Sequence, residues 1–433
     1  MPEALRDETV AVLRRLVRMN TVNPPGNERP AQEYLAGLCE RAGLEVSLLG
    51  PDPDRPNLVA RLRGRAEGPV LGLLSHVDTV VADPAGWRHD PWSGALDDGC
   101  VWGRGALDMK SQTAAETVAA CSLARDGWRP ARGDLLLISV SDEEVGGTGA
   151  DWLTSEHPEL VRCDYLLNEG AGESVEIDGA RHYGVALGEK GVFRFTLTTE
   201  GTAGHASVPA IADNALLKLG PLLDAIAQRQ AGWDVTPAAR ALLAELGVAV
   251  DGDPAGALAA LRERAPAFAP LVEAMLRVTL APTMVDASEQ MNVIPATARL
   301  HVDCRVPPGM GERAVLERIH EVIGTAGYSL EFTERVVGNA SAPESPLLDA
   351  LRSWVEDSDP GARCLPTLSA GYSDSHAFRD AFPDCVAYGF FPHRHMSLEL
   401  LGALVHGRDE RIDVRDLLLA VDCYRWVATE LLG

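Results

Sequence analysis

The stretch VLGLLSHVDT, residues 70–79, joins a nearly continuous apolar run to a His-x-Asp triplet. A run of this kind is typical of a strand buried on both faces of a parallel sheet. The triplet stands at the carboxyl end of that strand, where open α/β sheets place their ligands. On an extended backbone His76 and Asp78 point to the same face, so the Asp78 carboxylate can orient the His76 imidazole. The stretch therefore predicts an α/β domain with a ligand site at this end of its sheet.

Strand-like and helix-like patterns alternate on both sides of this stretch. Short apolar runs predict buried strands, and apolar residues at helical spacing predict helices between them. This alternation indicates a layered α/β domain. The predicted strands lie at 44–49, 58–62, 70–74, 135–140 and 164–167, and the predicted helices include 8–20, 111–125 and 414–431.

The pattern changes near residue 192, where apolar and polar residues alternate with a period of two, as in a half-exposed strand with a free edge. The elements then follow the order β-α-β-β-α-β, which is typical of a small α+β domain of the ferredoxin-like type. An Ala- and Leu-rich stretch at 233–277 predicts inserted helices. The sequence therefore predicts a discontinuous α/β catalytic domain at 1–187 and 337–433, with an inserted domain at 188–336.

The composition of the 433 residues excludes several classes of protein. The formal net charge is −24, so we expect neither nucleic acid nor a membrane surface as a partner. The eight cysteines include no C-x-x-C pair, which argues against a disulfide framework and against a thiolate zinc site. The charged N-terminus lacks the apolar core of a signal peptide, and no run of about 18 apolar residues is present. These features predict a cytoplasmic protein.

Acidic residues and histidines recur where the predicted strands end. Five of them supply nitrogen and oxygen donors without thiolate, a set that suits zinc, with cobalt or manganese as substitutes. Five donors exceed the three protein ligands of a typical catalytic site with one zinc ion. Two divalent ions that share a bridging carboxylate would use all five and leave Glu143 as the base. The five predicted ligands are His76, Asp108, Glu144, Glu169 and His406.

These motifs resemble, in order and spacing, those of the dinuclear-zinc amidohydrolase and exopeptidase family that includes aminoacylase, acetylornithine deacetylase, succinyl-diaminopimelate desuccinylase and glutamate carboxypeptidase. The resemblance runs from TVNPPGNE at 21–28 to His406. It implies a division of roles within the metal site. His76 and Glu169 would bind one ion, and Glu144 and His406 would bind the other. Asp108 would bridge both ions and precede a cis peptide bond to Met109. Asp78 would orient His76, and Glu143 would be the general acid/base.

The resemblance also implies roles outside the metal site. The inserted domain would be the lid and dimerisation domain of a homodimer. His205, in GHASVP at 204–209, would reach the neighbouring subunit's active site and stabilise the tetrahedral intermediate. Asn292, Arg305, and Gly371 and Ser373 of one loop resemble residues that bind the substrate.

The predicted function is hydrolysis of the amide bond of an N-acyl amino acid, whose free carboxylate would pair with Arg305. A dipeptidase or aminopeptidase of the same family is the near alternative. A non-catalytic metal-binding regulatory protein is an alternative of another class, but it predicts loss of Glu143 or of a ligand, and none is lost. A nucleotide-binding enzyme is not supported, since neither phosphate-binding glycine motif is present around Gly103 and Gly105.

Overall fold

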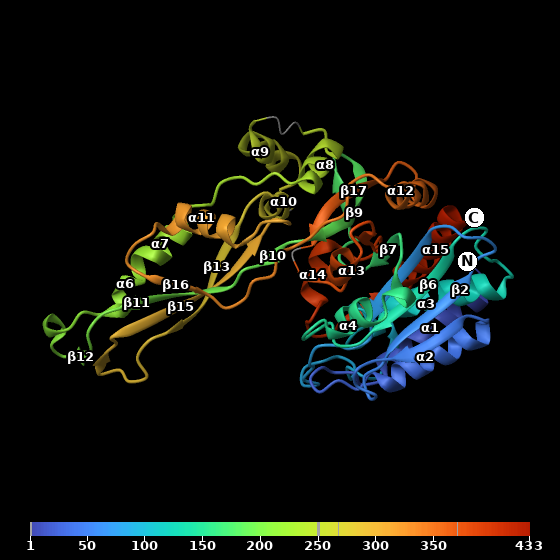
Figure 1. Ribbon diagram of the computed structural model, residues 1–433, viewed down its shortest axis with the longest axis horizontal. Helices are drawn as coiled ribbons and strands as arrows, with labels where there is room; N and C mark the ends of the chain where they lie inside the picture. The colour runs from blue at the N-terminus through green and yellow to red at the C-terminus, as the bar shows by residue number, and fades with distance from the viewer. Residues whose placement is uncertain (1, 249–251, 267, 370) are drawn as a thin grey trace. The chain divides into compact units, whose positions relative to one another are not determined.

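The computed structural model describes residues 2–248, 252–266, 268–369 and 371–433. The chain forms two compact units. Unit 1 comprises Met1–Gly188, Ser341–Ser369 and Ser373–Gly433, and unit 2 comprises Glu189–Ala340 with Ala370–Tyr372. Many elements of both units are labelled in Figure 1.

Unit 1 is built on a nine-stranded sheet in the order β1-β2-β6-β3-β7-β18-β9-β17, with β8 paired to β9. The central strands β6, β3, β7 and β18 run parallel, and β1 and β2 join one side in antiparallel fashion. The strands are β1 (Glu45–Leu49), β2 (Asn57–Arg63), β3 (Val70–His76), β6 (Asp134–Val140), β7 (Tyr165–Asn168), β8 (Ser174–Ile177), β9 (Ala180–Glu189), β17 (Arg363–Ser369) and β18 (Val386–Gly389). A separate small sheet contains β19 (Arg411–Asp413), β5 (Cys100–Trp102) and β4 (Ala95–Asp97).

Helices cover both faces of this sheet, and alternate side chains of β6 point to these two faces. Leu136, Ile138 and Val140 pack in one core with residues of α4 and α13, while the residues between them point to the other face. The helix α3 contacts α1, α2, α15 and β3, and its residues from Lys110 to Ala124 are buried on all sides. The helices are α1 (Glu3–Val17), α2 (Arg29–Ala42), α3 (Lys110–Arg125), α4 (Thr148–Glu156), α5 (Pro158–Val161), α12 (Pro346–Ser358), α13 (Ser375–Ala381), α14 (Leu398–Leu404) and α15 (Val414–Leu432).

Unit 2 has a five-stranded antiparallel sheet in the order β10-β15-β11-β16, with β13 also paired to β15. Alternate residues of β15, from Ala298 to Val306, share one core with apolar residues of α7 and α11. The strands are β10 (Gly191–Val192), β11 (Phe195–Glu200), β13 (Thr279–Asp286), β15 (Thr297–Val306) and β16 (Ser329–Phe332), and β12 (Gly204–His205) pairs with β14 (Val293–Ile294). The helices are α6 (Ala215–Lys218), α7 (Gly220–Gln228), α8 (Pro237–Glu245), α9 (Pro254–Arg264), α10 (Ala269–Met275) and α11 (Glu312–Ile323), with a 3-10 turn η1 (Pro209–Ile211).

The predicted α/β class is confirmed, and the order β-α-β-β-α-β is present in unit 2. The expectation that the strand near 192–199 offers a free edge is wrong, because β11 pairs with β15 on one side and with β16 on the other. The long exposed edge belongs to β13, where Met284 and Val285 are 62% and 49% exposed. Among the described helices, none has both the length and the apolar character needed to cross a membrane.

Candidate metal centre

The order of three parallel strands explains how the candidate site is assembled. In the sheet β3 lies between β6 and β7, and its last residue His76 pairs with Val140, the last residue of β6. Glu143 and Glu144 follow β6 directly, and Glu169 follows β7. Because parallel strands end at the same edge of a sheet, residues about 70 and 90 positions away from His76 in sequence are brought beside it.

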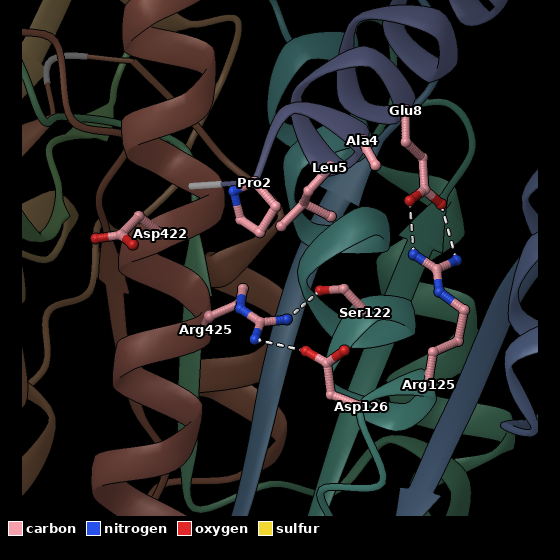
Figure 2. Close-up of a pocket in the computed structure, with 9 residues that line it drawn as sticks. All are labelled: Pro2, Ala4, Leu5, Glu8, Ser122, Arg125, Asp126, Asp422 and Arg425. Atoms are coloured by element: carbon pink, nitrogen blue, oxygen red, sulfur yellow. Dashed lines mark hydrogen bonds and ion pairs between the residues drawn. The ribbon is translucent and has the colours of Figure 1, made fainter.

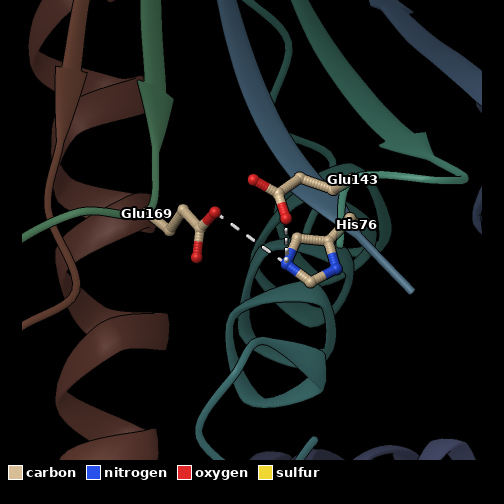
Figure 3. A group of neighbouring side chains, drawn as sticks. All are labelled: His76, Glu143 and Glu169. Carbon is tan, nitrogen blue, oxygen red and sulfur yellow. Dashed lines mark ion pairs between the residues drawn. The ribbon is translucent and has the colours of Figure 1, made fainter. Parts of the chain in front are cut away.

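The His76 imidazole has one nitrogen committed to the protein and one available. Its Nδ1 donates to the carbonyl oxygen of Asp78 at 3.1 Å, which leaves the lone pair on Nε2. Nε2 is buried and makes no hydrogen bond of normal geometry within the described part of the chain, although it lies 3.8 Å from Oε1 of Glu169 and 3.9 Å from Oε2 of Glu143 (Figure 3). A buried imidazole lone pair among carboxylates is the arrangement expected of a metal ligand.

Asp108 lies between the two histidines. Its Oδ1 is 3.3 Å from Nε2 of His76, and its Oδ2 is 3.0 Å from Nε2 of His406. His406 also lies 3.3 Å from Oε2 of Glu144. Burial acts against ionisation of Asp108, but its contacts with His406 and His76 hold its pKa well below the usual range. A carboxylate with one oxygen facing each imidazole has the geometry of a bridge between two ions.

These side chains therefore fit divalent metal ions. Their donor atoms form two overlapping groups, each within 4.8 Å: His76, Glu143 and Glu169 in one, and His76, Asp108 and Glu144 in the other. The structure thus brings together the five predicted ligands and Glu143, all within unit 1. The Asp108–Met109 peptide bond is cis, as the resemblance implied.

Asp78 fixes the loop that carries the two glutamates. Its carboxylate is fully buried and accepts hydrogen bonds from the backbone N–H groups of Glu143 and Glu144, both at 3.2 Å. It also accepts from Nδ2 of Asn23 at 2.9 Å. Burial opposes its ionisation, but contact with His76 and these hydrogen bonds lower its pKa. With these contacts the Asp78 carboxylate can orient His76 and hold the glutamates in place.

The electrostatics of Glu143 differ from those of Asp108. Burial raises the pKa of Glu143 well above its usual range, a protonated His76 would oppose this, and the negative charge of Asp374 adds to it. Asp374 is itself buried, and burial raises its pKa. A carboxyl group whose pKa is pushed upwards can both accept and donate a proton, as a general acid/base requires.

Two residues without a predicted role support the site from behind. Oε1 of Glu410 accepts from the backbone N–H groups of Leu107 and Asp108 at 2.7 and 3.1 Å, and its Oε2 pairs with Arg104. Arg104 in turn donates to the carbonyl oxygen of His406 at 3.1 Å. The pair is buried and joins the Asp108 loop to the His406 loop. The two residues stand 306 positions apart, so their pairing left no local signal in the sequence.

The predicted residues of unit 2 lie at two places, the β12–β14 ribbon and strand β15 of the five-stranded sheet. His205 is exposed on β12, its Nδ1 lies 2.7 Å from Oγ of Ser207, and the pairing of β12 with β14 places Asn292 beside this strand. Arg305 on β15 donates from Nε to Oδ1 of Asp303 at 2.8 Å. An anchoring role for Arg305 therefore has to compete with an existing ion pair.

The loop with the other two predicted binding residues leads into α13. Gly371 is exposed, whereas Ser373 is 4% exposed and its carbonyl oxygen accepts from the backbone N–H of His376 at 3.0 Å. The next residue, Asp374, is the one whose charge acts on Glu143. No role for Asp374 was predicted from the sequence.

Two pockets of unit 1 differ in their relation to this cluster. One of about 280 Å³ is lined by Asp108 and Glu169 themselves, together with Glu173 and His393. A larger one of about 510 Å³ lies between α1, α3 and α15 (Figure 2). There Arg125 pairs with Glu8 and Arg425 with Asp126, and none of the predicted site residues lines it. The smaller pocket is therefore the one connected to the candidate chemistry.

Comparisons with known proteins agree with this geometry. The model of Peptidase family M20/M25/M40 matches residues 72–430. Succinyl-diaminopimelate desuccinylase of Cereibacter sphaeroides is 27% identical over 95% of both chains, and that of Rhodospirillum centenum is 29% identical over 97% of this chain and 96% of the relative.

Solved structures show the same fold. The M20 family metallo-carboxypeptidase Sso-CP2 from Sulfolobus solfataricus superposes with a TM-score of 0.73 and 18% identity, over 98% of this chain and 99% of that chain. The Bacillus subtilis YXEP protein, described as a dinuclear metal binding peptidase from the M20 family, superposes with a TM-score of 0.63 and 14% identity, over 100% and 98% of the two chains.

Proposed function

The chain belongs to Peptidase family M20/M25/M40 and is a metallohydrolase acting on amide bonds, and from that premise we propose that its substrates are N-acyl amino acids. The observation that carries this proposal is the arrangement of Asp108, with one carboxylate oxygen facing each histidine, beside Glu143. The succinyl-diaminopimelate desuccinylases, which match nearly the full length of the chain, support an N-acyl amino acid as the substrate class.

We propose that the site binds two divalent ions, with zinc as the preferred metal and cobalt or manganese as substitutes. His76 and Glu169 would hold one ion, Glu144 and His406 the other, and Asp108 both. Ions in these places would polarise the amide carbonyl and lower the pKa of a water from about 15.7 towards 7.

The chain's own residues would carry the protons. Glu143 takes a proton from the attacking water and passes it to the nitrogen of the leaving amine, so that it starts and ends in the same state. Asp78 keeps the His76 imidazole in one orientation and holds the backbone of Glu143 and Glu144. The adjacent glutamates thus have separate tasks, since Glu144 binds metal while Glu143 remains free to exchange protons.

The residues of unit 2 would complete the site. His205 would donate a hydrogen bond to the developing oxyanion in the partner subunit of a homodimer, and Asn292 with Arg305 would hold the substrate, together with Gly371 and Ser373. The exposed edge of β13 supports dimerisation, because the edge strand of a sheet with apolar side chains can pair with a second copy. A cytoplasmic location belongs to the same proposal.

The deciding experiment combines metal analysis with a substrate panel. Zinc-loaded protein should contain close to two ions per chain and should hydrolyse N-acyl amino acids. Saturation at one ion with full activity would contradict the dinuclear site. Hydrolysis confined to esters, with no amide cleaved, would contradict the proposed reaction.

A further inference from the structure

The smaller pocket of unit 1 offers a means of substrate selection next to the candidate metal centre. It has a volume of about 280 Å³, and Asp108 and Glu169 form part of its wall. Phe391, Leu401 and Val405 make another part of the wall apolar. We call it the acceptor pocket, because its remaining polar residues, Gln112, Glu173 and His393, include two that present hydrogen-bond acceptors.

Glu173 is the residue that distinguishes this pocket. Among the described residues, no lysine or arginine forms an ion pair with its carboxylate. Burial raises the pKa of this carboxyl group, and the charge of His393 acts in the opposite direction. A half-buried carboxylate on a pocket wall, with no lysine or arginine paired to it among the described residues, is available to a cationic ligand.

The neighbouring polar groups reinforce this character. Gln112 uses its Nε2 to donate to Oε1 of Glu116 at 2.9 Å, so its amide oxygen is the group left to accept. Nδ1 of His393 finds no hydrogen-bond partner among the residues that the structure describes, and it lies 3.9 Å from Oδ2 of Asp416. The pocket therefore presents mainly hydrogen-bond acceptors, which suit a ligand that donates hydrogen bonds.

The backbone holds Glu173 in a fixed position. Glu173 forms a parallel β-bridge with His393, and the N–H of His393 donates to the carbonyl oxygen of Gly172 at 2.8 Å. Gly172 has a φ of +121°, and a Cβ at this position would lie 1.8 Å from the carbonyl oxygen of Phe391, so only glycine permits this close approach. The carboxylate is thus presented to the pocket by a rigid segment, as a selective contact requires.

From these contacts we propose that the acceptor pocket selects substrates that carry an alkylammonium group, with Glu173 as the residue that binds it. The apolar wall would pack against the carbon chain, and Glu173 and the oxygen of Gln112 would accept from the ammonium. This inference rests on the proposed function and narrows it, because an acyl group that ends in a carboxylate would meet Glu173 with like charge. The ammonium can be the free amine of an aminoacyl group or the side-chain amine of a basic amino acid.

Matched substrates separate these two sources. Glycyl-alanine and N-propionyl-alanine differ only in an ammonium against a methyl group on the acyl side, and Nα-acetyl-lysine and Nα-acetyl-norleucine test the amino acid side. In at least one pair we expect kcat/KM to favour the ammonium by about ten- to a hundredfold, as for a charged hydrogen bond. Glu173→Gln should remove that preference, and Glu173→Lys should shift it towards N-succinyl-alanine. The matched control Glu176→Gln, an exposed acid on the adjacent strand β8, should keep it.

A binding measurement separates this inference from the proposed function. Metal-loaded protein should bind propylammonium by calorimetry, and Glu173→Gln should lose that binding while it retains its metal content. If amides are hydrolysed but neither substrate pair shows a preference that depends on Glu173, the inference is wrong and the proposed function stands. If no amide is hydrolysed, the proposed function is wrong, and the propylammonium titration still decides the role of Glu173.

Discussion

The candidate residues of unit 1 and unit 2 lie in contrasting surroundings. In unit 1 the sheet order places His76, Glu143 and Glu169 at adjacent strand ends, and the buried carboxylates of Asp78 and Glu410 accept backbone hydrogen bonds that fix the loops around them. In unit 2 His205 and Asn292 are exposed on a two-stranded ribbon. The contrast teaches that the candidate metal ligands all lie within one unit, whereas the roles proposed for the exposed residues would require a substrate or a second chain.

The largest effect that this comparison predicts is at Glu143. Glu143→Gln keeps the shape of the side chain but cannot carry a proton, so kcat should fall by about two to four orders of magnitude. The metal content should stay at the wild-type level, because Glu143 is not among the proposed ligands. The exposed Glu156→Gln on α4 serves as the control and should leave kcat unchanged. Loss of metal with only a small loss of rate would mean that Glu143 and Glu144 have been assigned the wrong way round.

The next effect concerns the exposed residue of unit 2. His205→Ala should lower kcat by about two to three orders of magnitude if His205 stabilises an oxyanion. If it acts in the partner's site, mixing His205→Ala chains with Glu143→Gln chains should restore activity, up to about a quarter of wild type for random pairing in a dimer. Each mixed dimer then has one site with both defects and one with neither.

The mixing experiment requires proof that mixed dimers form. Two different affinity tags, purified in sequence, provide it. Tagged mixed dimers without recovered activity would show that His205 acts in its own chain or has no part in the reaction. If the protein is a monomer at all tested concentrations, His205 cannot act in the site of a partner subunit.

A smaller effect is expected behind the metal centre. Glu410→Gln keeps an acceptor for the N–H groups of Leu107 and Asp108 but loses the charge that pairs with Arg104. Since such supporting contacts orient metal ligands, we expect metal affinity to fall by about ten- to a hundredfold in a competition titration with a chelator. Glu399→Gln, exposed on α14, is the matched control. Unchanged affinity in a folded Glu410→Gln protein would mean that backbone packing alone positions Asp108.

The smallest effect concerns Arg305. Arg305→Ala should raise KM for the free acid of an N-acyl amino acid by about tenfold or more, as for a lost charged hydrogen bond, and should affect the corresponding methyl ester much less. Because Arg305 already pairs with Asp303, Asp303→Asn is the informative companion variant, and it should alter KM in the same assay. Equal losses on acid and ester would assign Arg305 a structural role in the sheet of unit 2.

Much of the fold follows from the sequence. The strands predicted at 70–74, 135–140 and 164–167 coincide with β3, β6 and β7 to within about two residues. Local periodicity suffices there because strands buried on both faces must be continuously apolar. The donor types were also readable, since nitrogen and oxygen ligands at strand ends suggest a metal, but the roles of individual ligands stay predictions.

Sequence alone did not decide which strands pair at long range. The pattern of residues 192–199 suggested a free edge, yet β16 returns from beyond α11 to pair with β11 and leaves β13 at the edge. Alternation reports which face of a strand is buried, but it carries no information on which neighbour satisfies the backbone hydrogen bonds.

The sequence by itself therefore determined the α/β class, the strand ends and the chemical type of the site. Only the tertiary structure decided that the two oxygens of Asp108 face different histidines, that Arg104 meets Glu410, and that Glu173 lines a pocket beside Glu169. The physical reason is that residue type and spacing express burial and local hydrogen bonding. Contacts between loops hundreds of residues apart arise only when the sheet order brings those loops to one edge.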